Sequence, residues 1–204
     1  MNKTKRKILE NSIEIFNSKG VADVSLRFIA KEIGISHGNL MYHFKSKSEI
    51  IQGIHQMLLE KAIELNEGID RLNFDITELY VATKKGFQVI HEFRFLLNEL
   101  LYIVKTDRNM LNIIRSIEKT RTKMYEELIQ LSIENGLMRK EIYKSEYDNL
   151  IKRIRIFSDH WLTSAFIYDG LEQEPDFDKY TNLFVDQFYP YLTEKGRLVV
   201  KNNN

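Results

Sequence analysis

The stretch Ser25–Lys47, SLRFIAKEIGISHGNLMYHFKSK, decides the fold of this chain. Its apolar residues first recur at helical spacing, stop at Gly34, and restart four residues apart at Leu40 and Phe44. Glycine is favoured just after a helix because it adopts a left-handed backbone without strain. The stretch therefore predicts two short helices joined by a very short turn.

The turn has two further features of a helix-turn-helix unit. Ala30 has almost no side chain, so a second helix can cross the first closely at this point. Ser36 can cap the second helix through its hydroxyl group, as Ser25 can cap the first. In a helix-turn-helix unit, the second helix enters the major groove of DNA by its N-terminal end. We therefore expect this stretch to bind DNA.

Six residues of the second helix remain for DNA once Ile35, Leu40 and Phe44 are assigned to the core. Asparagine can bond an adenine edge, methionine can contact a thymine methyl group, and tyrosine and histidine can bond phosphate. The alternative is the solvated face of an ordinary helical hairpin. The six are His37, Asn39 and Met41, expected to read bases; Tyr42 and His43, expected to hold phosphates; and Gly38, which permits close approach.

Residues 29–51, IAKEIGISHGNLMYHFKSKSEII, resemble the DNA-binding signature of the TetR/AcrR family of bacterial transcriptional regulators. In that family a short recognition helix is followed by a YHF-like segment and by K-x-K at the start of the fourth helix. The match covers roughly residues 5–55. The resemblance implies that Arg27 reaches a base or a phosphate from outside the recognition helix, and its alternative is a surface arginine. It also implies an effector cavity in a helical C-terminal domain.

The start of the next helix offers a further phosphate contact. Ser46 is expected to cap this helix, with Glu49 completing a capping box. A positive side chain there is unfavourable unless a phosphate lies in front of the helix, so Lys47 is predicted to bind phosphate rather than to be structural. The predicted DNA-binding residues are Ser25, Arg27, Ser36, His37, Gly38, Asn39, Met41, Tyr42, His43 and Lys47.

The composition favours an all-α protein. The chain has 204 residues, of which 43% are hydrophobic, only two are proline and none is cysteine. Such a chain can bury a core and form long helices, and it has neither disulfides nor thiolate metal sites. The longest wholly apolar run, Leu100–Val104, is far shorter than the ~20 residues that span a bilayer. We expect a cytoplasmic protein that does not enter the membrane.

The charge is distributed unevenly along the chain. Residues 1–50 contain nine Lys and Arg against five Asp and Glu, a net charge of +4, and the remaining residues carry −3. Positive charge near the helix-turn-helix stretch favours phosphate contacts through counterion release. The acidic remainder would keep the rest of the protein off the DNA.

Apolar spacing predicts about nine helices and two domains. We expect a helix-turn-helix DNA-binding domain over residues 1–46 and an effector-binding and dimerisation domain over residues 47–200. Asp75 is a predicted cap, Pro190 is expected to end or kink the last helix, and residues 201–204 are expected to be disordered. Besides the two short helices, the predicted helices cover about residues 3–19, 47–65, 76–93, 95–107, 108–135, 145–168 and 177–189. The first of these helices is expected to end at Gly20 and to turn Ile8, Leu9, Ser12, Ile13 and Phe16 inward.

Polar and aromatic residues on the apolar helices of the second domain predict a small-molecule pocket. Buried polar groups must pair with one another or with a ligand. The alternative is that most are surface tips or satisfied core groups. The aliphatic and aromatic surroundings favour a lipophilic effector. The predicted ligand-binding residues are Tyr80, Lys84, Phe87, His91, Asn98, Tyr102, Arg121, Tyr125, Phe157 and Trp161.

With the resemblance, these features predict a ligand-responsive repressor. It would bind a palindromic operator in double-stranded DNA as a homodimer joined through its last two helices. The sequence contains no H-E-x-x-H pair, no glycine-rich phosphate loop and no G-x-S-x-G motif, so we expect no enzyme activity, metal or cofactor. Two alternatives are an all-α small-molecule sensor or carrier without DNA binding, and a helical enzyme that uses a pocket carboxylate.

Overall fold

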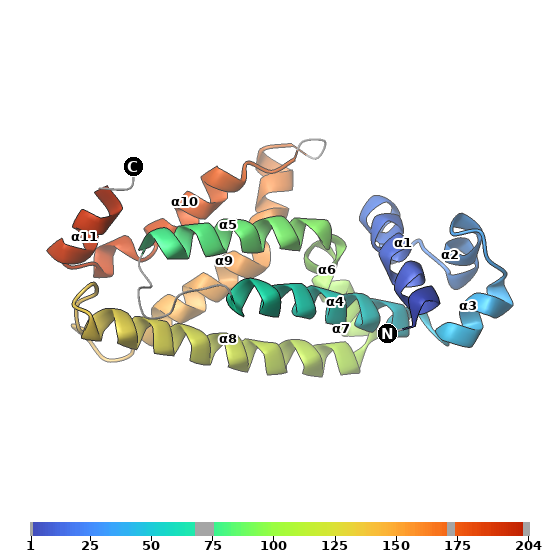
Figure 1. The fold of residues 1–204 in the computed structure, drawn as a ribbon, viewed down its shortest axis with the longest axis horizontal. Coiled ribbons are helices and arrows are strands. Elements are labelled where there is room, and N and C mark those ends of the chain that lie inside the picture. The colour runs from blue at the N-terminus through green and yellow to red at the C-terminus, as the bar shows by residue number, and fades with distance from the viewer. Residues whose placement is uncertain (1, 68–75, 171–173, 202–204) are drawn as a thin grey trace. The chain divides into compact units, whose positions relative to one another are not determined.

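The structure is a computed structural model that describes residues 2–67, 76–170 and 174–201. These residues form eleven α-helices and one 3₁₀ helix, and none of them lies in a β-strand (Figure 1). The predicted all-α fold is confirmed. In chain order the elements are α1 Lys3–Lys19, α2 Leu26–Glu32, α3 His37–His43, α4 Lys47–Glu67, α5 Ile76–Glu92, α6 Phe95–Asn98, α7 Leu100–Thr106, α8 Arg108–Glu134, α9 Glu146–Tyr168, α10 Phe177–Asp186, η1 Tyr189–Tyr191 and α11 Glu194–Lys201.

The prediction of about nine helices was too low for two reasons. The helix expected over residues 95–107 is divided into α6 and α7 at Glu99, whose backbone leaves the helical region at φ −112° and ψ 19°. Pro190 lies inside η1, after α10 has already ended at Asp186, and the chain then forms α11, which the sequence did not predict. The predicted cap Asp75 and residues 202–204 lie outside the described residues.

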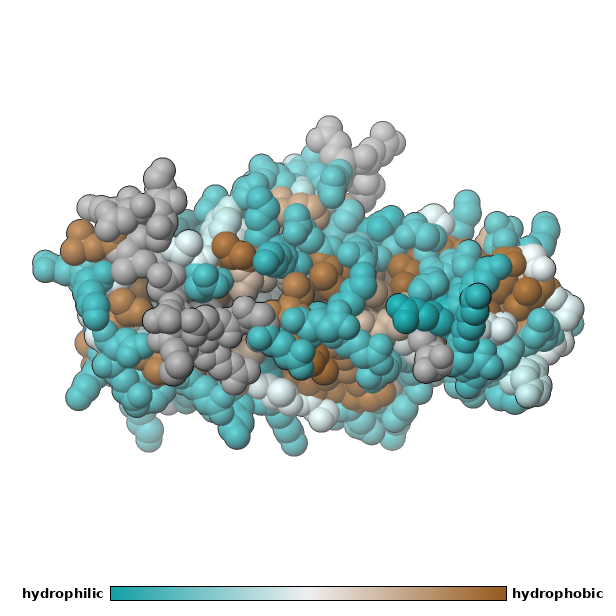
Figure 2. Space-filling model, viewed as in Figure 1, coloured by the Kyte–Doolittle hydropathy of each residue, from teal (hydrophilic) through white to brown (hydrophobic). Residues whose placement is uncertain are grey.

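The chain divides into two compact units, each with its own core. The first comprises Met1–Ile63 and Val89–Ile113, and the second comprises Glu64–Gln88 and Ile114–Asn204. The predicted functional boundary after residue 46 stays a prediction. No helix among the described residues is long and apolar enough to cross a membrane. Hydrophilic residues cover most of the face shown in Figure 2, and hydrophobic residues form smaller areas between them.

The core of the first unit forms around the predicted inner face of α1. Val21 and Val24, which follow α1, are 1% and 2% exposed, as expected for residues that fill the core beside it. Gly20 ends the helix with φ 80°, a backbone conformation that favours glycine. The buried residues of α1 itself are those predicted, namely Ile8, Leu9, Ser12, Ile13 and Phe16.

The core of the second unit contains a cluster of aromatic rings from α5, α9 and α10. Trp161 is 2% exposed and stacks on Phe87 with the ring centroids 4.3 Å apart. Phe184 meets Phe87 edge-on at 5.9 Å and Phe157 at 6.0 Å. Burying such large apolar groups contributes strongly to the stability of a domain, so this cluster fixes α5 and α10 on α9.

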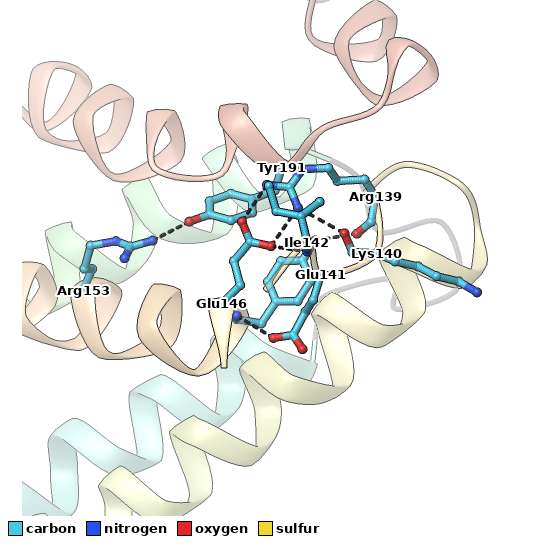
Figure 3. Close-up of polar contacts among 8 residues, drawn as sticks. Arg139, Lys140, Glu141, Ile142, Glu146, Arg153 and Tyr191 are labelled. Carbon is cyan, nitrogen blue, oxygen red and sulfur yellow. Dashed lines mark hydrogen bonds and ion pairs between the residues drawn. The ribbon is translucent and has the colours of Figure 1, made fainter. Parts of the chain in front are cut away.

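A polar clamp in the second unit joins the segment after α8 to the start of α9 (Figure 3). The Arg139 guanidinium donates two hydrogen bonds to the Glu146 carboxylate, at 2.7 and 2.8 Å. The backbone N–H of Ile142 donates to the same carboxylate at 2.9 Å. Tyr191 of η1 accepts a hydrogen bond from Arg153, and its ring lies against Arg139. The clamp therefore ties η1 to the loop between α8 and α9.

Glu146 should make the stability of the protein depend on pH. The hydrogen bonds from Arg139 lower the pKa of Glu146 from its ordinary 4.5 to about 2. A carboxylate whose pKa is lower in the folded state than in the unfolded state stabilises the fold fully when the pH is above its unfolded-state pKa. This stabilisation is lost as the pH falls through the folded-state pKa. The thermal midpoint of Glu146→Gln should lie below that of the wild type near pH 7, and this gap should narrow steadily between about pH 4.5 and pH 2.

The matched control is Glu127→Gln, which removes a carboxylate from an exposed ion pair with Lys123. Such pairs contribute little to stability, so this variant should follow the wild-type midpoint at every pH. The thermal midpoints of the two variants and the wild type are measured at each pH by thermal denaturation followed by circular dichroism. A gap for Glu146→Gln that stayed constant down to pH 2 would show that ionisation of Glu146 is not the cause.

Candidate nucleic-acid interface

The two helices of the predicted DNA-binding stretch are α2 and α3, and each begins at the predicted serine. The Ser25 hydroxyl accepts a hydrogen bond from the Phe28 N–H at 3.2 Å, and the Ser36 hydroxyl accepts one from the Asn39 N–H at 3.1 Å. Gly34 lies between the helices with φ 72°. Both predicted caps and the glycine turn are confirmed, since each depends only on residues three or four positions apart.

The recognition helix α3 is anchored from one side. Leu40 is fully buried and Phe44 is 6% exposed, and Ala30 of α2 is 2% exposed, as close helix crossing requires. Ile35, which the sequence assigned to the buried side, is only half-buried because it lies in the turn before the Ser36 cap. Two apolar anchors thus fix which face of α3 turns outward.

The outward face of α3 carries the predicted polar residues. His37, Gly38 and Asn39 are exposed, and the Asn39 side chain makes no hydrogen bond within the described residues. Tyr42 is 76% exposed, and its ring meets that of His43 edge-on at 5.0 Å. Met41 and His43 are half-buried. Ser25, Arg27 and Ser36, the predicted residues outside α3, are exposed too.

Lys47 occupies a different environment from the one expected. Its ammonium donates hydrogen bonds to the backbone carbonyls of Val21 and, at 2.9 Å, of Val24. Burial lowers the pKa of Lys47 below its ordinary value, against the opposing attraction of the Glu99 and Asp23 carboxylates. The sequence preferred phosphate binding over a structural role, but the ammonium has a structural role here. Local spacing could not reveal this because Val21 is 26 residues away.

The capping box at the start of α4 is also shifted. The Ser46 hydroxyl accepts a hydrogen bond from the Glu49 N–H at 3.2 Å, as predicted. The Glu49 carboxylate accepts one from the Lys45 N–H at 2.8 Å, one residue before the expected partner. Lys45 itself is exposed, as is Lys5, whose ammonium lies 5.6 Å from the centre of the Phe44 ring. Neither lysine was among the predicted DNA-binding residues, although the +4 charge of residues 1–50 pointed to this region.

Comparison with known proteins places this geometry in a family. Residues 8–54 match the family model described as bacterial regulatory proteins, tetR family. Residues 54–199 match the model described as bacterial transcriptional repressor, TetR. The chain belongs to the TetR family of bacterial transcriptional regulators. The predicted resemblance is confirmed, and the protein is a DNA-binding transcriptional regulator.

Relatives and solved structures agree with this assignment. An HTH-type transcriptional regulator of Staphylococcus aureus strain USA300 is 24% identical over 194 residues, which cover 95% of each chain. A TetR-family regulator from Marinobacter aquaeolei VT8 has the same fold, with a TM-score of 0.85 and 21% identity over 99% of this chain and 98% of that one. The structure of a putative transcriptional regulator from Saccharomonospora viridis in complex with choline matches with a TM-score of 0.74 and 15% identity. That match covers 95% of this chain and 100% of the other.

The predicted ligand-binding residues of this TetR-family regulator do not form one group. His91, Asn98 and Tyr102 belong to the first compact unit, and Asn98 and Tyr102 are exposed. The other seven belong to the second unit. Phe87, Phe157 and Trp161 form the aromatic cluster described above, together with Phe184, which the sequence did not single out. Tyr80, Lys84, Arg121 and Tyr125 are on α5 and α8.

Most of the polar members have protein partners. Tyr80 and Lys84 both donate to the Asp178 carboxylate, Lys84 at 2.6 Å. The hydrogen bond from the Tyr80 hydroxyl to Asp178 raises the pKa of Tyr80 to about 12. Arg121 donates to Asp159 at 3.2 Å. For these three residues the alternative of satisfied polar groups agrees with the structure. A hollow of about 200 Å³ lies at the end of α9, and none of the ten residues lines it.

Trp161 is the exception among the predicted ligand residues. Its indole nitrogen is buried and has no hydrogen-bond partner among the described residues. Burying an N–H without an acceptor is unfavourable, and such groups are uncommon in folded proteins. An acceptor atom supplied from outside the chain would satisfy it. Trp161 thus combines an apolar surface with one unused donor inside the aromatic cluster.

Proposed function

We propose that this TetR-family regulator is a ligand-responsive repressor that binds a palindromic operator as a homodimer. The observation that carries the proposal is the exposed polar face of α3, held by the Ser36 cap and anchored by Leu40 and Phe44. A capped helix with one anchored face presents its outward residues in a fixed register, as base reading requires. Such a protein acts where the chromosome is, in the cytoplasm.

The residues of this face have separate roles in the proposal. Base edges are read by side chains with a matching donor and acceptor pattern, whereas phosphates position the protein without carrying sequence information. Arg27 reaches the DNA from α2, beside its Ser25 cap. We assign base reading to His37, Asn39 and Met41 and close backbone approach to Gly38. The proposed phosphate contacts are Ser25, Ser36, Tyr42, His43 and the exposed Lys45.

Exposed apolar residues on α9 and α10 support the proposed dimer. Ile156 and Ile167 of α9 are 56% and 65% exposed, and Leu183 of α10 is 47% exposed. Large apolar side chains on the surface of two adjacent helices are expected where a second subunit packs. An interface that joins the same surface of both subunits has a two-fold axis, and this axis requires a palindromic operator.

The proposed effector binds in the second unit, at the aromatic cluster around Trp161. The cluster is apolar, which favours a lipophilic ligand, and the unpaired indole N–H favours a ligand with an acceptor atom. The complex of the Saccharomonospora viridis regulator with choline shows that a protein of this fold holds a small molecule. An effector alters DNA binding only through different affinities for two conformations of the protein, typically by about 1–3 kcal/mol.

The fluorescence of Trp161 can be used to detect binding of the proposed effector. It is the only tryptophan in the chain, so the intrinsic indole fluorescence reports this cluster alone. Titration with a library of lipophilic compounds should change the emission for at least one compound and raise the thermal midpoint with it. The matched control is Trp161→Phe, which should lose the thermal shift for ligands that accept from the indole. A library that changes neither quantity would contradict the proposed site.

Selection of duplexes from a random DNA pool tests the proposed function. We expect the purified protein to enrich a palindrome and to bind it with two chains per duplex, measured by electrophoretic mobility and by light scattering. Promoter fragments upstream of its own gene serve as a second source. Failure to enrich any duplex at low salt would favour the small-molecule sensor without DNA binding.

A further inference from the structure

The turn between α1 and α2, residues 20–24, is held from two sides by opposite charges. The Val21 N–H donates a hydrogen bond to the Glu99 carboxylate at 2.7 Å. The carbonyl of the same residue accepts a hydrogen bond from the Lys47 ammonium, which also bonds the Val24 carbonyl at 2.9 Å. An anion therefore binds the amide of Val21 and a cation binds its carbonyl. These charge-assisted bonds are stronger than neutral ones.

Glu99 is brought to the turn because α6 is fixed on α1. The Asn17 side-chain amide donates to the Glu92 carbonyl at 2.8 Å, and its oxygen accepts from the Phe95 N–H at 3.1 Å. The rings of Phe16 and Phe95 lie 5.0 Å apart. These contacts hold the chain on both sides of the start of α6, so the position of Glu99 follows that of α1.

The approach of Glu99 also depends on Gly20. A Cβ atom at this position would lie 3.1 Å from the Glu99 carboxylate oxygen, tighter than ordinary contact. With Gly20 at positive φ, the Val21 N–H donates to that same oxygen. From the sequence, this glycine was expected only to end a helix. The structure gives it a second reason, which is access of a carboxylate to the turn.

We propose that Lys47 and Glu99 are positioning residues for DNA binding, and that neither contacts the DNA. The proposal rests on the proposed function. The turn that they hold leads directly through Val24, which is buried, into Ser25, the cap of α2. A change in the turn therefore moves α2, and α3 with it, because Ala30 and Leu40 are packed in the same core. Lys47 therefore affects the position of α3 through the turn and α2, without contacting the DNA.

This proposal and phosphate binding predict different salt dependence. Each phosphate contact contributes about 0.9 to the slope of log affinity against log salt concentration. Lys47→Met should lower the affinity for the selected duplex about tenfold and leave this slope at the wild-type value. Lys45→Met is the matched control, because it removes the same charge from an exposed position two residues earlier. It should reduce the slope and leave the turn intact.

Hydrogen exchange of the Val21 amide, measured by NMR without DNA, tests the positioning directly. Exchange should be at least about tenfold faster in Lys47→Met and in Glu99→Ala, should remain slow in Lys45→Met, and should be largely restored in Glu99→Gln, whose amide oxygen can still accept. A slope reduced by about 0.9 per site in Lys47→Met, or unchanged Val21 exchange in either variant, would overturn the proposal.

These outcomes are separate from failure of the proposed function. If Lys47→Met does not fold, Glu99→Ala and Glu99→Gln provide the same test from the other side of the turn. The measurements are again the affinity for the duplex, the slope of its salt dependence and the exchange rate of the Val21 amide. If the wild type selects no duplex, the proposed function fails on that result alone. The exchange measurement then decides independently whether Lys47 and Glu99 hold the turn, and unchanged exchange rejects the holding contact itself.

Discussion

Leu183→Glu is expected to lower the affinity of the regulator for its selected duplex by about 10²–10⁴-fold. Leu183 is 47% exposed on α10, while Phe184 beside it is 2% exposed and Tyr180 is 5% exposed. A charge at position 183 therefore spares the core of the subunit and opposes packing of a second subunit. Two half-sites joined in one dimer bind far more tightly than one, so loss of the dimer removes this gain.

Light scattering and DNA affinity measure the two parts of this expectation separately. Leu183→Glu should have the mass of a single chain and should keep the helical content of the wild type, measured by circular dichroism, whereas its thermal midpoint should fall because dimerisation no longer stabilises the folded chain. Ile142→Glu is the matched control, because Ile142 is 74% exposed but lies between α8 and α9, outside the proposed interface. A Leu183→Glu variant that remained dimeric and bound the duplex normally would place the interface elsewhere.

The sequence predicted those features that depend on neighbouring residues. Ser25 and Ser36 were identified as caps because a helix start needs an acceptor three residues before an N–H group, and both caps are present. The bounds of α1 and its buried face were predicted from apolar spacing and Gly20 alone. Leu40 and Phe44, four residues apart, likewise indicated the buried side of α3. The residues of α3 that are proposed to face DNA lie on the opposite side.

Features that depend on distant residues could not be predicted. Glu99 divides the helix expected over residues 95–107, and its carboxylate binds the N–H of Val21, 78 positions earlier. Helix propensity gives no signal for such a contact, because tertiary interactions decide the backbone there. The direction of Lys47 was missed for the same reason. A lysine at a helix start has the same sequence signature whether it binds a phosphate or a carbonyl.

The predicted ligand-binding residues show a third limit of prediction from the sequence. Polar residues on apolar helices indicate that a partner exists but do not reveal which one. For Lys84 the partner is Asp178, 94 positions later, and for Arg121 it is Asp159. Among the ten predicted ligand residues, Trp161 has a buried donor with no hydrogen-bond partner in the described part of the chain. The sequence therefore located the aromatic cluster through Phe87 and Trp161, but it could not separate satisfied groups from free ones.

Asn39→Ala is expected to lower the affinity for the selected duplex by a factor of about 5–150, corresponding to about 1–3 kcal/mol. The Asn39 side chain is exposed and makes no hydrogen bond within the described residues, so its amide is free to bond an adenine edge. The Ser36 cap accepts from the backbone N–H of Asn39, which alanine keeps. The substitution should therefore leave α3 folded and remove a single contact.

Specificity distinguishes this contact from a general loss of affinity. A second selection with Asn39→Ala should relax the preference at one base pair in each half-site and leave the other positions unchanged. Lys45→Met is the matched control, since loss of a phosphate contact should weaken all sequences about equally and flatten the salt dependence. If Asn39→Ala selected the wild-type operator with wild-type affinity, the base-reading assignment would be wrong. Membership of the TetR family would stand, because it follows from matches over residues 8–199 rather than from one side chain.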